Sequence, residues 1–249
     1  MNAAARPSGR PQAVRALEEF ATAQHGYVTR AQAAQVGISD VLLLRLVRDG
    51  YLERYEHGVY RFRGAPDLRW EGVWVAWLRL DPEHDAVERA RHPSEITRGP
   101  TAAWVYAVGN LQPEPYEFWI SSHRRIRRHD VRLRTGRPPD RDIAVVEGLP
   151  LTTPERTVAD LVSDGYDLGH VADVIRDAVR GRLLDRPGLA ERLGAVLAGC
   201  CPSADEPWQP PWHGSSPWRH RDPPTWQAIR LAGRTASGGH RARQDGRTG

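Results

Sequence analysis

The segment "DGYLERYEHGVYRF", residues 49–62, restricts the fold more than any other part of the sequence. Its two halves, "YLERY" and "VYRF", are rich in the aromatic and β-branched residues that strands favour. The short "EHG" between them contains Gly58, which can adopt the positive φ that a tight hairpin loop needs. The spacing therefore predicts a two-stranded β-hairpin with its tip at "EHG".

Three short helical runs precede this hairpin. Residues 11–24, "PQAVRALEEFATAQ", place their apolar side chains on one helical stripe. In "VTRAQAAQVGIS", Thr29 is the expected N-cap of a second helix and Gly37 its stop. Ser39 is the expected cap of a third run, "DVLLLRLVRDG", which ends at Gly50. Three helices followed at once by a hairpin are the element order of a winged helix-turn-helix domain.

The third predicted helix has two faces of different character. Leu43, Leu46 and Val47 form a core-facing stripe. The opposite face is either simply solvated or free to enter a DNA major groove, where polar side chains bind base edges and leucine contacts a thymine methyl. Basic residues on the hairpin would contact the phosphate backbone. The predicted DNA-binding residues are Thr29, Arg30, Ser39, Asp40, Leu44, Arg45, Arg48, Arg54, His57 and Arg61.

The rest of the chain up to residue 200 predicts a mixed α/β domain. Residues 95–110 have the composition of a helix, "PYEFWISSHRRIRRHDVRLRTG" predicts two strands joined by a basic turn, and "DIAVVEGLPLTT" predicts another strand. In "TTPERTVADLV", Thr152 and Glu155 have the spacing of a capping box, and Arg156 can pair with Asp160 one turn later. Further helices are predicted over 168–181 and 187–198.

The run "HRRIRRHDVRLR", residues 123–134, is the strongest positive cluster in the sequence. One interpretation is a contact surface for DNA flanks, RNA or an acidic partner. The other is an exposed basic hairpin without a partner, and any buried arginine there would need a carboxylate. The residues of this possible contact patch are Arg124, Arg125, Arg127, Arg128, Arg132 and Arg134.

The basic residues are all arginine, because the sequence contains no lysine. This excludes chemistry that needs a lysine, including a Walker phosphate loop, a Schiff base and the lysine of common nuclease metal sites. His84, Asp85, Glu88 and His92 imitate a metal-ligand spacing, but the short charged segment that holds them favours a solvated helix. We therefore predict no catalytic residue, no metal and no cofactor. A net charge of +4 allows a nucleic-acid partner without requiring one.

The termini complete the predicted organisation. Adjacent Cys200 and Cys201 cannot build a disulfide framework or a spaced zinc site, and the sequence shows neither a signal peptide nor a membrane span, so we expect a cytoplasmic protein. The end of the chain is rich in tryptophan, proline and arginine, which indicates either disorder or a shifted reading frame. The predicted divisions are a flexible N-terminus (1–10), a winged helix (11–64), an α/β domain (65–200) and the tail (201–249).

Two stretches together resemble a known family. "YVTRAQAAQVGIS" with "RLVRDGYLERYEHGVYRF" resembles the N-terminal winged helix of AbiEi-type antitoxins of type IV toxin-antitoxin systems, which act in abortive infection. "GLPLTTPERTVADLV", residues 148–162, is similar to the segment that opens the C-terminal helices of actinobacterial members.

The resemblance implies an α+β protein with two roles. The winged helix would bind inverted repeats in the promoter of its own operon and repress transcription. The C-terminal domain would counteract a nucleotidyltransferase toxin, and the resemblance suggests that the two proteins act without a stable complex. The alternative is a stand-alone winged-helix regulator whose second domain senses a ligand or mediates dimerisation. A nuclease-like enzyme ranks behind both.

Overall fold

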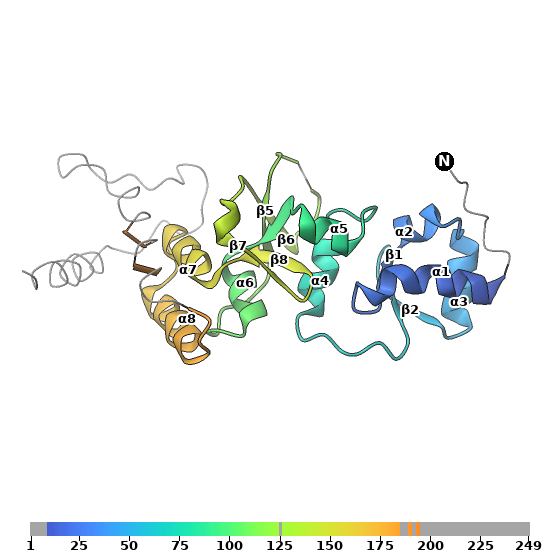
Figure 1. Cartoon of the computed structure of the whole chain (residues 1–249), viewed down its shortest axis with the longest axis horizontal. Coiled ribbons are helices and arrows are strands. Elements are labelled where there is room, and N and C mark those ends of the chain that lie inside the picture. Colours follow the sequence, from blue (N-terminus) through green and yellow to red (C-terminus); the bar gives the residue numbers. More distant parts are fainter. Residues whose placement is uncertain (1–8, 125, 185–188, 191–192, 195–249) are drawn as a thin grey trace, which may run out of the picture. The chain divides into compact units, whose positions relative to one another are not determined.

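The computed structural model describes residues 9–124, 126–184, 189–190 and 193–194 (Figure 1). All of these residues belong to one compact unit of the chain. They form eight α-helices and two β-sheets, which confirms the α+β class. The predicted tail, residues 201–249, and most of the predicted helix at 187–198 lie outside the described residues. No helix in the described part is long and apolar enough to cross a membrane.

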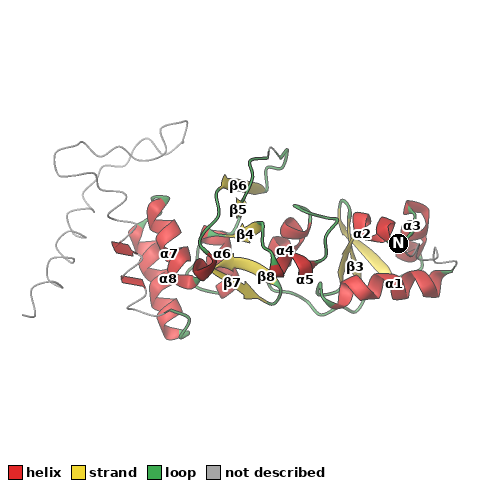
Figure 2. Cartoon of the chain, turned by 45° about the horizontal axis from the view of Figure 1, so that its top comes forward, coloured by secondary structure: helices red, strands yellow, loops and turns green. Residues whose placement is uncertain are grey.

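The N-terminal elements have the expected order, with one strand added. Strand β1 was not predicted; it pairs antiparallel with β3, which pairs in turn with β2, so the hairpin is part of a three-stranded sheet (Figure 2). The elements are α1 (Arg10–Thr22), β1 (Tyr27–Thr29), α2 (Arg30–Gln35), α3 (Asp40–Arg48), β2 (Leu52–Glu56) and β3 (Val59–Phe62).

Local hydrogen bonds explain where these helices begin. The Thr29 hydroxyl accepts from the Gln32 backbone N–H at 3.0 Å, and the Gln32 side chain accepts from the Thr29 N–H at 3.0 Å, which makes a complete capping box for α2. The Ser39 hydroxyl accepts from the Leu42 N–H at 3.3 Å and caps α3. Gly58 has a φ of 78° at the tip of the hairpin. These three local predictions are confirmed.

A separate apolar cluster holds this winged helix together. It contains one stripe from each helix and the inward side chains of the sheet, and each of these residues is almost fully buried. Burial of Leu43 and Leu46 in this cluster leaves the opposite face of α3 directed outward. The members are Ala13, Leu17, Ala21, Val28, Ala33, Ile38, Leu43, Leu46, Leu52 and Tyr60.

The second sheet has five strands in the order β6-β5-β4-β8-β7. Strands β5 and β6 run parallel, so the prediction that a basic turn joins them as a hairpin is wrong. The segment between them instead returns to the end of the sheet at which β5 begins. The predicted helix at 95–110 begins with a strand, and the single strand predicted in "DIAVVEGLPLTT" is a hairpin of two. The strands are β4 (Glu95–Thr97), β5 (Tyr116–Ile120), β6 (Val131–Thr135), β7 (Ile143–Val146) and β8 (Leu149–Thr152).

Five helices accompany this sheet. Helix α4 is apolar on all sides and places Trp74 and Trp77 in the core, where both are fully buried. Helix α7 is capped by Thr153 rather than by Thr152, because Thr152 is the last residue of β8. The helices are α4 (Glu71–Leu78), α5 (Ala86–Arg91), α6 (Gly99–Tyr106), α7 (Pro154–Ser163) and α8 (Leu168–Arg180).

Buried amides join the winged helix to the segment before α5. The side chains of Gln24 and Gln32 bond each other in both directions, at 2.9 and 3.0 Å, and both are fully buried. The Gln24 side-chain oxygen also accepts from the Ala86 N–H at 3.1 Å, and Gln32 donates to the His84 carbonyl at 3.2 Å. The Trp74 indole N–H donates to the Gln24 carbonyl at 3.2 Å. This junction therefore satisfies polar groups that would be costly to leave unpaired in the interior.

Candidate nucleic-acid interface

Helix α3 presents the outward face that the sequence predicts. Val41, Leu44, Arg45 and Arg48 recur at intervals of three and four residues, so they lie on one side of the helix. Val41 and Leu44 are each 58% exposed, so their methyl groups are accessible to a partner. The Arg48 side chain is 71% exposed, and Arg45 forms no ion pair with any residue that the structure describes. This face combines apolar and cationic groups, which suits both thymine methyl groups and guanine or phosphate.

An exposed ion pair joins the start of α2 to the start of α3. Arg30 donates to both carboxylate oxygens of Asp40, with Nε–Oδ1 at 2.6 Å and Nη2–Oδ2 at 2.5 Å. The hydrogen bond from Arg30 lowers the pKa of Asp40 below its ordinary value. The pairing offsets the repulsion that a lone carboxylate at this position would exert on a phosphate. Both side chains stay more than half exposed, so Arg30 retains access to solvent.

Two predicted contact residues do not face the outside. Thr29 is fully buried, and its hydroxyl donates to the Pro82 carbonyl at 2.5 Å. The Arg61 side chain is only 12% exposed; its Nη2 donates to the Ala65 carbonyl at 2.7 Å and to Asp67 Oδ1 at 2.8 Å. Because their polar groups are already used inside the protein, we remove Thr29 and Arg61 from the candidate interface.

The other two hairpin residues lie together at the tip. The Arg54 Nη2 and His57 Nδ1 atoms are 3.1 Å apart, and both residues are exposed. The Arg54 guanidinium carries a permanent positive charge at this tip, which suits the tip to a phosphate. The candidate interface, as defined from here on, consists of Arg30, Ser39, Asp40, Val41, Leu44, Arg45, Arg48, Arg54 and His57.

An open groove of about 620 Å³ lies between the hairpin tip and the α2–α3 turn. Its lining includes Arg30, Asp40, His57 and Arg79. Arg79 was not among the predicted DNA-binding residues, because it follows the predicted winged helix by many residues. In the structure Arg79 forms an ion pair with Glu56 of strand β2, so it anchors the hairpin near its tip.

Most arginines of the predicted basic patch are paired with carboxylates. Arg132 bonds Glu117 at 2.7 Å, Arg134 approaches Asp164 at 3.4 Å and Arg124 approaches Glu95 at 3.4 Å. Arg128 pairs with Asp130, Arg127 is exposed, and Arg125 lies outside the described residues. The internal ion pairs neutralise much of the positive charge, so this segment is a weak candidate for a free nucleic-acid surface.

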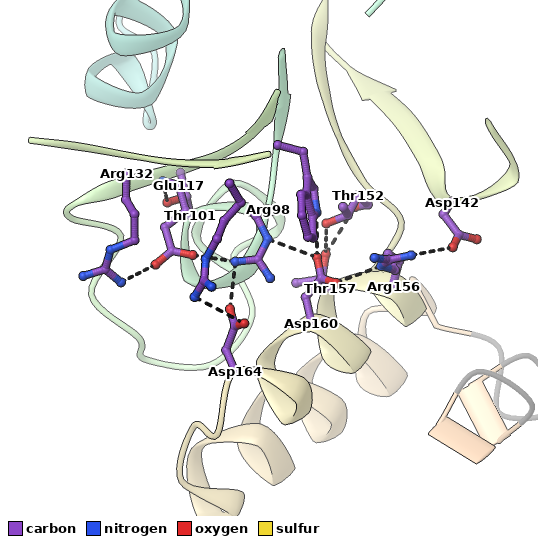
Figure 3. A network of polar contacts seen from close by, with 12 residues as sticks. Arg98, Thr101, Glu117, Arg132, Asp142, Thr152, Arg156, Thr157, Asp160 and Asp164 are labelled. Carbon is purple, nitrogen blue, oxygen red and sulfur yellow. Dashed lines mark hydrogen bonds and ion pairs between the residues drawn. The ribbon is translucent and has the colours of Figure 1, made fainter. Parts of the chain in front are cut away.

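Several of these ion pairs belong to a buried network around Arg98 (Figure 3). The Arg98 side chain is 2% exposed, and its Nη1 bonds Glu117 at 2.8 Å and Asp164 at 2.7 Å. Its guanidinium carbon lies 4.6 Å from the centre of the Trp119 ring. The predicted pair between Arg156 and Asp160 is present at 2.8 Å. The network ties the start of α6 to β5 and α7, which is a structural role.

The residues with an apparent metal-ligand spacing have other partners. The Asp85 carboxylate accepts from the Glu88 N–H at 2.8 Å and caps α5. The His84 Nδ1 atom lies 2.9 Å from Asp81 Oδ2. Within the described ranges, no group of three or more histidine, cysteine, aspartate or glutamate residues is arranged to hold a metal ion.

Comparison with known proteins finds a family that the N-terminal region resembles. Residues 15–63 match the family model "Transcriptional regulator, AbiEi antitoxin". This N-terminal region is therefore similar to the AbiEi antitoxin regulators. The matched residues include α2, α3 and the whole hairpin, and therefore the complete candidate interface. The match confirms the resemblance seen in the sequence.

One solved structure is also similar to a large part of the chain. The crystal structure of the RV2827C protein from Mycobacterium tuberculosis is 17% identical, with 79% of this chain and 75% of that chain covered and a TM-score of 0.44. No curated protein matches the chain.

Proposed function

We propose that this protein binds double-stranded promoter DNA through its winged helix and represses its own operon. The observation that carries the proposal is the outward face of α3, where Val41, Leu44, Arg45 and Arg48 are exposed inside the segment that matches the regulator family. A helix of this kind fits the major groove, and the hairpin tip at Arg54 and His57 is suited to the adjacent backbone.

The chemistry divides between recognition and attachment. Val41 and Leu44 offer methyl groups to thymine, while Arg45 and Arg48 can bind guanine edges or phosphates. Arg54 and His57 add contacts that depend on salt because they release counterions from the DNA. Ser39 keeps an exposed hydroxyl that can donate to an acceptor while it caps α3.

The test is binding of the full chain to a duplex from the promoter upstream of its own gene. Replacing Arg45 and Arg48 together by alanine should weaken binding at fixed salt, by about 1–3 kcal/mol for each arginine that binds a guanine edge. Arg176→Ala is the matched control, because Arg176 is an exposed arginine on α8, outside the winged helix. Equal affinity of the double variant and the control would reject α3 as the recognition helix.

We further propose that the second half of the chain acts as an antitoxin in the cytoplasm, against a nucleotidyltransferase toxin encoded beside it. The support for this proposal is the match of residues 15–63 to an antitoxin regulator family, together with the resemblance of residues 148–162 to the C-terminal segment of such antitoxins. Expression of this protein should restore the growth of cells that express the neighbouring nucleotidyltransferase toxin. A variant that lacks α7 and α8 should not restore growth. If the full chain gives no rescue, a stand-alone regulator becomes the better interpretation.

A further inference from the structure

The Arg30–Asp40 ion pair lies where a helix-turn-helix protein meets the bases of DNA. Asp40 is the first residue of α3, and the N-terminal residues of a recognition helix are those that contact base edges. The Arg30 side chain comes from α2 and places its guanidinium on the Asp40 carboxylate. The Arg30 backbone N–H donates to the Gly58 carbonyl at 2.9 Å, which places this residue beside the hairpin tip. Both side chains line the open groove between the tip and the α2–α3 turn.

The geometry of the pair leaves a second donor edge on the Arg30 guanidinium. A guanidinium carries one N–H on Nε and two on each Nη nitrogen. Nε and Nη2 each donate to one carboxylate oxygen of Asp40, at 2.6 and 2.5 Å, so the contact uses the side of the group. The remaining N–H groups of Nη1 and Nη2 form a fork of two parallel donors at the end of the side chain. The Arg30 side chain is 59% exposed, so this fork can reach a partner.

Guanine offers the complement to this fork. In the major groove its O6 and N7 atoms are adjacent acceptors, and arginine binds both at once. A phosphate could accept from the same fork, but the ion pair carries no net charge with which to attract it. Asp40 stays ionised, because the hydrogen bond from Arg30 lowers its pKa, and its unused lone pairs can accept from the amino group of a cytosine. The pair therefore suits base edges better than the DNA backbone.

We propose that Arg30 and Asp40 act as one unit that specifies a guanine in the DNA site, with Arg30 donating to guanine O6 and N7 and Asp40 holding the guanidinium in place. This inference rests on the proposed DNA binding through α3 and adds a base specificity to it. Arg30 is then a specificity-determining residue, and Asp40 is its positioning residue. The guanine bound by Arg30 is distinct from any that Arg45 or Arg48 binds farther along α3.

The test uses duplexes of the promoter upstream of this gene in which each G·C pair is replaced in turn by A·T. The full chain should lose about tenfold in affinity at the pair that Arg30 reads, since a bidentate arginine discriminates between bases by about that factor. Arg30→Ala should bind this duplex and the unaltered promoter with affinities within about twofold of each other, and should keep its discrimination at other guanines. Replacing the same guanine by 7-deazaguanine, which lacks the N7 acceptor, should weaken the wild type but not Arg30→Ala.

Three comparison variants separate base reading from a backbone contact. Arg54→Ala at the hairpin tip should weaken binding to all duplexes by the same factor, because a phosphate contact carries no sequence information. Arg30→Lys keeps the charge but lacks the fork, so it should lose the discrimination as Arg30→Ala does. Asp40→Asn removes a negative charge, so it should bind unrelated DNA at least as tightly as the wild type and yet discriminate less at the Arg30 position. A merely structural role of Asp40 would not produce these opposite changes.

The outcomes also separate this inference from the proposed function. If the wild type binds the promoter, the inference alone is overturned by unchanged discrimination in Arg30→Ala or in Asp40→Asn. It is equally overturned if Arg30→Ala loses the same factor on every duplex, because Arg30 would then be a phosphate contact. A wild type that binds no promoter duplex would refute the proposed function, and the guanine contact with it.

Discussion

Replacing Arg98 by methionine removes a buried positive charge but keeps a side chain of similar length. Arg98 contacts Glu117, Asp160 and Asp164, and the carboxylates of all three are 14% exposed or less. Removing one partner from a buried ion pair costs about 3–5 kcal/mol, because the remaining charge is left without compensation.

The neighbouring arginines reduce this cost. Glu117 keeps Arg132, and Asp160 keeps Arg156, although these two arginines are 51% and 25% exposed and compensate less well than a buried group. We therefore expect a loss near the lower limit, about 3 kcal/mol of unfolding free energy. For a chain of this size, that loss lowers Tm by roughly 6–12 °C, at about 2–4 °C for each kcal/mol.

Urea denaturation followed by circular dichroism measures this difference directly. Arg176→Met is the control, because Arg176 is 53% exposed and pairs with Asp173, so its loss should cost about 0–1 kcal/mol. Adding Asp164→Asn to Arg98→Met should recover part of the stability, since it removes a carboxylate that would keep only its longer contact with the half-exposed Arg134, at 3.4 Å. Equal stability of Arg98→Met and Arg176→Met would refute the interpretation of the network as a structural clamp.

Two further predictions concern the segment that joins the winged helix to α5. Gln24→Leu should destabilise the protein by about 3 kcal/mol, because the Tyr27 carbonyl and the Ala86 N–H lose a buried partner, and a change below about 1 kcal/mol in urea denaturation would contradict this. The hydrogen bond to Asp81 raises the pKa of His84 above its ordinary 6.5, so this pair stabilises the fold below pH 6.5 and loses its contribution as the pH rises through the folded pKa. NMR titration should show this raised pKa and its return toward 6.5 in Asp81→Asn, and identical titration curves would exclude the pairing.

Local signals made the winged helix predictable. Thr29 and Ser39 cap helices within three residues of themselves, and Gly58 sets a turn through its own backbone. Such features depend on neighbouring residues only, so the sequence displays them directly. The outward face of α3 followed from its spacing for the same reason.

Contacts between distant segments were not predictable in this way. Arg61 faces inward because Ala65 and Asp67, beyond the end of the hairpin, hold its guanidinium. The parallel pairing of β5 with β6 depends on how the intervening segment crosses, and composition does not determine that path. The partners of Arg98 come from residues 117, 160 and 164, so only the folded chain brings them together.

The buried amide pair of Gln24 and Gln32 also determines how this module can be moved between proteins. Its outer hydrogen bonds end on the backbone at His84 and Ala86, after the whole of α4. A chimera cut just behind the hairpin would therefore expose the side-chain amides of Gln24 and Gln32 to solvent and remove their backbone partners. Recombination that transplants this winged helix intact needs to carry the chain as far as Ala86, and fusion proteins designed from it should keep the same endpoint.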